Sequence, residues 1–227
     1  MPNHEDSVAE LIDIQLAGHS FQLLANCGLF WPAQSMLFVA DTHFGKEATF
    51  RSHGIPVPIG ATAATLAKIA EMLRRTGAEQ LCILGDMFHA RSSIVKDVRE
   101  SLDRFFDEFK MVEVSLILGN HDTHLGTQLS SWPIKILEAG TTICSITLAH
   151  LPTAKPEGAD LVLCGHIHPA IRISSNTERF GKLPCFWYSR GQLVLPAIGD
   201  FTGTQVVRLA KEEQAWFIAD QNIYRAV

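Results

Sequence analysis

Five short apolar runs occur along the chain, and polar residues begin within two positions after the end of each. The runs cover residues 36–40, 81–84, 114–118, 143–148 and 161–164. Runs of this length, bounded by Gly or polar residues, are typical of buried β-strands. Residues 61–75 and 93–110 instead carry apolar side chains at helical spacing, and Gly77 would stop the first of these helices. Strands that alternate with helices predict an α/β fold with parallel strand pairing.

The beginning and the second half of the chain have a different pattern. Residues 12–16 alternate between apolar and polar positions, and residues 21–24 can pair with them as a hairpin. Residues 44–60 include the sequence Gly-Ile-Pro-Val-Pro, which excludes a regular helix there and predicts a long loop. In the second half, strand-like segments predominate: 134–138, 141–149, 170–174, 183–189, 192–196 and 205–209. We therefore expect two packed sheets with flanking helices, forming a single domain over residues 1–227.

The composition is that of an ordinary globular protein. The chain has 227 residues, of which 47% are apolar and 19% charged, with a net charge of −5. A mildly acidic chain has no overall electrostatic preference for nucleic acid, although a local basic patch remains compatible with it. The first ten residues are acidic and polar, unlike a signal peptide, and no apolar stretch has membrane-spanning length. Five widely spaced cysteines are read as reduced side chains, so a cytoplasmic protein without membrane association is expected.

The polar residues that follow the five apolar runs are of the kinds that bind metals. They are Asp41-Thr42-His43, Gly85-Asp86, Gly119-Asn120-His121-Asp122, Ala149-His150 and Gly165-His166-Ile167-His168. Sites assemble at strand ends in α/β sheets, so these groups can converge on one place. Carboxylate and imidazole suit divalent Mn, Fe, Zn or Co. Two such ions about 4 Å apart can hold the attacking and leaving oxygens of a displacement at phosphorus.

Each group also has a simpler interpretation. An isolated Asp-x-His is common, and a lone Gly-Asp is usually a turn. Gly-Asn-His-Asp and Gly-His-x-His are more specific, and the occurrence of all five groups in this order makes coincidence very improbable. Asp86, at a sharp strand end, is the natural carboxylate to bridge two cations.

At these residues the chain resembles the calcineurin-like metallophosphoesterase superfamily. The resemblance spans residues 41–168 and implies a four-layer α/β/β/α sandwich with a dinuclear metal centre. It also implies a role for each residue that matches a motif. One metal would be bound by Asp41, His43, Asp86 and His168, and the other by Asp86, Asn120, His150 and His166. His121 would protonate the leaving oxygen or stabilise charge on the phosphoryl group, and Asp122 would orient His121.

A closer resemblance lies partly outside these motifs. Asp-Thr-His-Phe-Gly-Lys at residues 41–46, Gly-Ile-Pro-Val-Pro at 54–58 and Leu-Pro-Ala-Ile-Gly-Asp-Phe-Thr-Gly at 195–203 are similar to the ligase-associated DNA damage response endonuclease family, often called PdeM. This resemblance implies DNA as the substrate, a role in DNA repair, and an ATP-dependent DNA ligase, a helicase and an exonuclease as partners. Manganese is the metal we expect.

Three residues near the first motifs are candidates for the substrate pocket. Lys46 and Arg51 could contact substrate phosphates, or could be a solvated cation and a structural ion pair. His89 could line the pocket or cap a surface turn. Two other functions remain open. One is a phosphoesterase acting on a small nucleotide or a phosphomonoester, and the other is a metal-free scaffold with the same fold.

Overall fold

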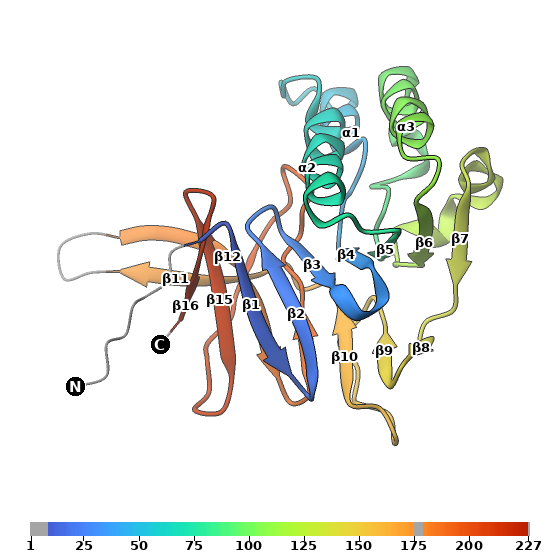
Figure 1. Cartoon of the computed structure of the whole chain (residues 1–227). Coiled ribbons are helices and arrows are strands. Elements are labelled where there is room, and N and C mark those ends of the chain that lie inside the picture. The colour runs from blue at the N-terminus through green and yellow to red at the C-terminus, as the bar shows by residue number, and fades with distance from the viewer. Residues whose placement is uncertain (1–8, 175–178, 227) are drawn as a thin grey trace.

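The computed structural model describes residues 9–174 and 179–226, which form two β-sheets with helices on one side (Figure 1). The first sheet follows chain order, with β1–β4 antiparallel and β4–β7 parallel. Its strands are β1 (Leu11–Leu16), β2 (His19–Leu24), β3 (Gly28–Trp31), β4 (Met36–Val39), β5 (Gln80–Leu84), β6 (Glu113–Ile117) and β7 (Ile134–Leu137). The predicted parallel pairing is therefore confirmed.

Three α-helices lie beside the parallel part of this sheet, as Figure 1 shows for α1, α2 and α3. They are α1 (Lys46–Ser52), α2 (Ala61–Thr76) and α3 (Lys96–Glu108). Short 3-10 turns accompany them: η1 (Pro32–Gln34), η2 (Arg91–Ser93), η3 (Asp122–His124) and η4 (Gly126–Ser131). The apolar faces of α2 and α3 belong to one core with the outer face of the sheet, in which Leu66 and Leu102 join Leu37 and Leu116. α2 ends at Gly77, which has a φ of 64°, as predicted.

The second sheet contains nine strands from the second half of the chain. Its order is β14-β11-β12-β13-β10-β9-β8, and β15 pairs with both β12 and β16. The strands are β8 (Thr142–Ile143), β9 (Ile146–Leu148), β10 (Leu161–Cys164), β11 (Pro169–Ser174), β12 (Arg179–Ser189), β13 (Gln192–Val194), β14 (Gln205–Val206), β15 (Gln214–Ala219) and β16 (Asn222–Arg225). A second apolar core lies between the sheets, where Phe38 and Leu84 from the first join Leu148 and Phe186 from the second.

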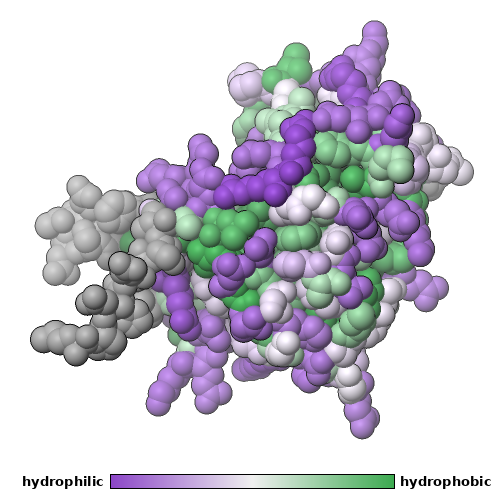
Figure 2. All heavy atoms as spheres, in the orientation of Figure 1, coloured by the Kyte–Doolittle hydropathy of each residue, from purple (hydrophilic) through white to green (hydrophobic). Residues whose placement is uncertain are grey.

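The surface of the molecule is mixed in polarity. Figure 2 shows hydrophilic residues over much of one face of the molecule, with hydrophobic residues in smaller areas between them. Among the described residues, no helix is long and apolar enough to cross a membrane.

The two-sheet α/β arrangement is confirmed, but four details differ from the predictions. The predicted loop over residues 44–60 contains α1, because the helix-breaking sequence begins only at Gly54 and leaves the preceding residues free to form two turns. The strand expected over 141–149 is divided by Cys144 and Ser145, which both have positive φ. Strands β3, β15 and β16 were not predicted. The resemblance implied a four-layer α/β/β/α sandwich, but within the described residues every helix precedes Trp132, so the second sheet has no outer helical layer there.

Candidate metal centre

The five polar groups predicted from the sequence meet at one edge of both sheets. Asp41, Asp86 and Asn120 follow the parallel strands β4, β5 and β6, while His150 and His166 follow the parallel strands β9 and β10. The carboxyl ends of parallel neighbours meet at the same edge of a sheet. Because the two sheets face each other, ligands separated by more than 120 residues become neighbours.

The first cluster consists of Asp41, His43 and His168, whose potential ligand atoms all lie within 4.8 Å of one another. The His168 Nε2 atom is 3.5 Å from Asp41 Oδ1. Its other ring nitrogen, Nδ1, lies 2.9 Å from the Gly203 carbonyl oxygen. That carbonyl can accept the Nδ1 proton, so Nε2 is left as the ligand atom.

The second cluster consists of Asp86, His150 and His166, again with ligand atoms within 4.8 Å of one another. His150 Nδ1 lies 3.0 Å from the Leu84 carbonyl oxygen, which turns Nε2 toward the cluster. His150 Nε2 is 3.5 Å from Asp86 Oδ1 and 3.1 Å from Asn120 Oδ1. The side chain of Asn120 therefore belongs beside this cluster.

Asp86 lies between the two clusters. Its Oδ1 atom faces His150, while Oδ2 is 3.9 Å from His43 Nε2. A carboxylate with one oxygen toward each cluster has the position required of a bridging ligand. The structure thus brings together all seven residues that the resemblance implied as metal ligands.

The backbone at this edge is held in an uncommon conformation. Five of the clustered residues have a left-handed φ, between 44° and 71°: Asp41, His43, Asp86, His166 and His168. Each such residue costs about 1–3 kcal/mol, and such strain concentrates at functional sites. The glycines of the motifs allow close approach, because a β-carbon at Gly85 would overlap the His150 ring and one at Gly119 would overlap the Asp86 carboxylate.

Buried atoms without partners show that this site fits a cation. Asp41 Oδ1 and both ring nitrogens of His43 are buried and have no hydrogen-bond partner within the described residues. Unpaired buried polar atoms are costly, and divalent cations would satisfy them. Burial, reinforced by the nearby positive charge of Lys46, lowers the pKa of His43 to about 2. The ring is therefore neutral at physiological pH, which is the form that binds metals.

His121 lies next to the clusters but is held differently. Its Nε2 atom is 3.9 Å from Asp86 Oδ2, and its backbone N–H donates to Asp86 Oδ1 at 3.0 Å. The Nδ1 atom lies 2.7 Å from the carbonyl oxygen of His89, and the two rings stack with their centres 5.2 Å apart. His89 therefore lines the site, which the sequence left open because its only signal was a spacing of three residues from Asp86.

Asp122 does not orient the His121 ring, contrary to the expectation from the resemblance. Its carboxylate accepts hydrogen bonds from the backbone N–H groups of Met87, Phe88 and Gly119, at 3.0–3.2 Å. It is 2% exposed, and burial raises its pKa. Asp122 begins the short turn η3 after β6, and its side chain is buried there. Asp122 thus joins the loops after β5 and β6, and the His89 carbonyl takes the orienting position.

The two cations expected to contact substrate are separated by the structure. Lys46 begins α1, and burial lowers its pKa while Asp86 and Asp41 act in the opposite direction, so its ammonium group lies near the clusters. Arg51 instead points to α3, where Nη2 is 3.7 Å from Asp97 Oδ2, and it donates to the Pro58 carbonyl at 3.5 Å. Arg51 lies about one and a half helical turns after Lys46 on α1. It forms a structural ion pair, which was the alternative to a substrate contact.

Two facing sheets with Asp and His ligands at their strand ends define a metallophosphoesterase. The sequence model of the calcineurin-like phosphoesterase family matches residues 35–154, more than half of the chain, and the chain belongs to this family.

One solved structure extends this similarity over 95% of the chain. The nuclease MPE of Pseudomonas putida is 31% identical with a TM-score of 0.82, and the match covers 95% of this chain and 100% of that one. AQ665 of Aquifex aeolicus, a protein of unknown function, and the E. coli phosphoesterase Yfce both have a TM-score of 0.42. They are 22% and 14% identical, covering 59% and 82% of this chain and 78% and 88% of theirs. A comparison with curated proteins found no match.

Proposed function

We propose that this protein hydrolyses phosphodiester bonds and that its substrate is DNA. The observation that carries the proposal is the position of Asp86 between two ligand clusters. The Nε2 atom of His121 lies 3.9 Å from Asp86 Oδ2. Similarity to a nuclease over 95% of the chain supports a nucleic-acid substrate. A role in DNA repair, with a DNA ligase, a helicase and an exonuclease as partners, is supported by the resemblance to the ligase-associated endonuclease family.

The proposed metal ions are two divalent cations, with manganese preferred. One would be held by Asp41, His43, Asp86 and His168, and the other by Asp86, Asn120, His150 and His166. Bound there, they would supply positive charge to the phosphoryl oxygens and to the attacking water. The mixed carboxylate, imidazole and amide ligands also suit Fe, Zn or Co.

The chain's own residues would position the substrate and move one proton. The His89 carbonyl accepts the Nδ1 proton of His121, so Nε2 faces the clusters. From there Nε2 can hold a proton and give it to the leaving oxygen. Lys46 can donate hydrogen bonds to a phosphoryl oxygen, because its ammonium group lies near Asp41 and Asp86.

A turnover panel with Mn²⁺ tests the function. We expect hydrolysis of an aryl phosphodiester and of DNA, with weaker hydrolysis of the matching monoester and of a cyclic nucleotide. Chelator-treated protein, reloaded with Mn²⁺ as the control, should lose activity and regain it. A marked preference for the monoester or the cyclic nucleotide would instead favour a small-molecule phosphoesterase. Protein that binds no metal and hydrolyses nothing would point to a scaffold.

A further inference from the structure

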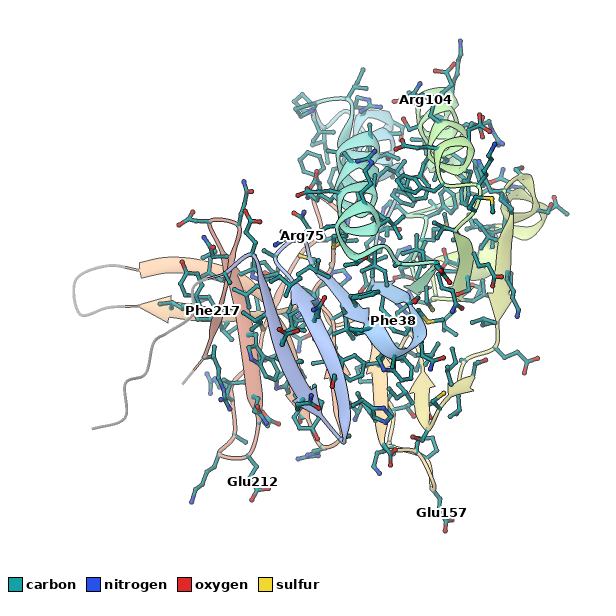
Figure 3. The ribbon with its side chains drawn as sticks, viewed as in Figure 1. Phe38, Arg75, Arg104, Glu157, Glu212 and Phe217 are labelled. Atoms are coloured by element: carbon teal, nitrogen blue, oxygen red, sulfur yellow. The ribbon has the colours of Figure 1, made fainter. Side chains whose placement is uncertain are left out.

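A groove outside the metal clusters lies between two pairs of strands, β11 with β14 and β15 with β16. Its volume is about 850 Å³. Apolar side chains and three arginines line it, among them Ile171, Leu209, Phe217, Arg172, Arg208 and Arg225. Phe217 lies on β15, on the left of the view in Figure 3. Its ring stacks on Tyr224 with the ring centres 5.1 Å apart.

The three arginines are exposed. Pro169 pairs with Gln205 and Ala170 with Val206, and Arg172 and Arg208 lie two residues beyond the last of these pairs and line the same groove. Like charges side by side on adjacent strands are destabilising unless an anion lies between them. Arginine ion pairs within residues 9–174 and 179–226 involve other residues, namely Arg51, Arg74 and Arg75. The groove therefore carries three positive charges without a carboxylate partner in the described part of the chain.

The strands that line the groove are joined to the metal centre through the backbone. His168 immediately precedes β11, and its carbonyl oxygen accepts a hydrogen bond of 3.0 Å from the N–H of Gln205, the first residue of β14. Arg172 is four residues beyond His168, about 13 Å along an extended strand. A polymeric substrate with its reacting group at the clusters could therefore reach Arg172 with a monomer only a few positions from the reacting one.

We propose that this groove binds an unpaired polynucleotide strand next to the cleaved bond, which rests on the proposed function. The arginines would contact phosphates, for which the guanidinium group is well suited. The apolar floor would contact bases, as sites for unpaired strands combine a basic groove with stacking surfaces. A duplex keeps its bases paired and stacked inside, away from Phe217. An acidic peptide fits the charge equally, but the short path along β11 from His168 to Arg172 favours the substrate.

The test compares two triple variants with equal charge. The groove variant is Arg172→Gln/Arg208→Gln/Arg225→Gln, and the control is Arg104→Gln/Lys110→Gln/Lys135→Gln, exposed cations on or near α3 and β7. Arg104 lies on α3, away from Phe217 in the view of Figure 3. Affinity for an unpaired 20-nucleotide strand is measured over a range of salt with Mn²⁺-loaded protein, in a His121→Ala background that limits cleavage. Turnover of the strand and of an aryl phosphodiester is measured with His121 present.

The groove variant should bind the strand at least about tenfold more weakly, and its log–log salt slope should fall by about 2, since each phosphate contact contributes about 0.7. Its turnover of the strand relative to the aryl diester should fall similarly. The control should keep the parent's slope. A version with Lys at all three positions, which retains the charge, should recover most of the slope, so loss through misfolding is separated from loss of contact.

Other outcomes would reject the proposed role of the groove without rejecting the proposed phosphodiesterase function. Equal slopes in the groove variant and the control would reject the proposal, as would a parent that hydrolyses the aryl diester but does not bind the strand. Binding of a Glu- and Leu-rich peptide by the parent but not by the groove variant, without strand binding, would assign the groove to a protein partner. If the parent hydrolyses no phosphodiester, the proposed function fails, while the binding measurements still decide whether the groove holds a strand.

Discussion

The metal clusters and the arginine groove are built in opposite ways. At the clusters, Asp41 is fully buried and Asp86 is 3% exposed, and five side chains stand on strained backbone. In the groove, Arg172 and Arg208 are exposed side chains that project from or beside extended strands. The first region fixes atoms through the backbone, whereas the second places charge on long, flexible side chains.

This difference suggests a division of tasks. Displacement at phosphorus requires reacting atoms to be held in one geometry, which rigid strand ends provide. Holding a polymer requires charge at approximate positions along its length. Changes in the clusters should therefore affect every substrate, and changes in the groove only long ones.

Replacement of Asp86 is the strongest test of this division. Asp86→Ala should lose both metals and all measurable turnover of the aryl diester and of DNA, because its two oxygens face different clusters. Elemental analysis and turnover check this, with Asp107→Ala, an exposed carboxylate on α3, as the control. Full metal content and activity in Asp86→Ala would remove the basis for a shared carboxylate.

Replacement of His121 tests proton transfer separately from metal binding. His121→Ala should keep its metals but lose about 10²–10⁴-fold in turnover, the usual range for a general acid. The loss should be smaller for a nitrophenol leaving group, which needs little protonation. His124→Ala, an exposed histidine in the same segment, is the control. Equal losses for good and poor leaving groups would indicate an electrostatic role.

Two glycines test whether close approach of the backbone matters. Gly85 and Gly77 both have positive φ, but only a β-carbon at Gly85 would overlap the His150 ring, while Gly77 has open space. Gly85→Ala should weaken metal binding about 10- to 100-fold, as loss of ligand orientation commonly does. Gly77→Ala should cost about 1–2 kcal/mol of unfolding free energy and leave metal affinity unchanged. Metal titration and thermal unfolding of both variants distinguish the two, and equal metal affinities would contradict the argument.

Lys46 and Arg51 lie on the same helix, α1, but have different surroundings. Replacing each of them tests how far the catalytic region extends along this helix. Lys46→Ala should reduce turnover of the aryl diester about tenfold, the loss expected for one hydrogen bond from a charged group. Arg51→Ala should change it little, since its guanidinium pairs with Asp97. Steady-state kinetics of the two variants test this. A larger loss in Arg51→Ala than in Lys46→Ala would assign the substrate contact to Arg51.

Much of the fold followed from local patterns. Short apolar runs identified β4, β5, β6 and β10, because buried strands have a distinct length and composition. Helix α1 was missed because the nearby prolines obscured its short sequence. Strands β15 and β16 were missed, although they pair with each other as a hairpin and β15 also pairs with the more distant β12.

For the site, the sequence by itself determined the types of ligand and their location at strand ends, since both are properties of short segments. Residue types and spacing did not divide the ligands into two sets. The family resemblance implied that division, and only the tertiary structure gives the distances within each set, because the distance from Asp41 to His168 depends on how two sheets pack. It also gave His121 a backbone carbonyl in place of Asp122, and paired Arg51 with a carboxylate on another helix. These contacts join segments through loop paths and side-chain directions, which residue types and spacing do not specify.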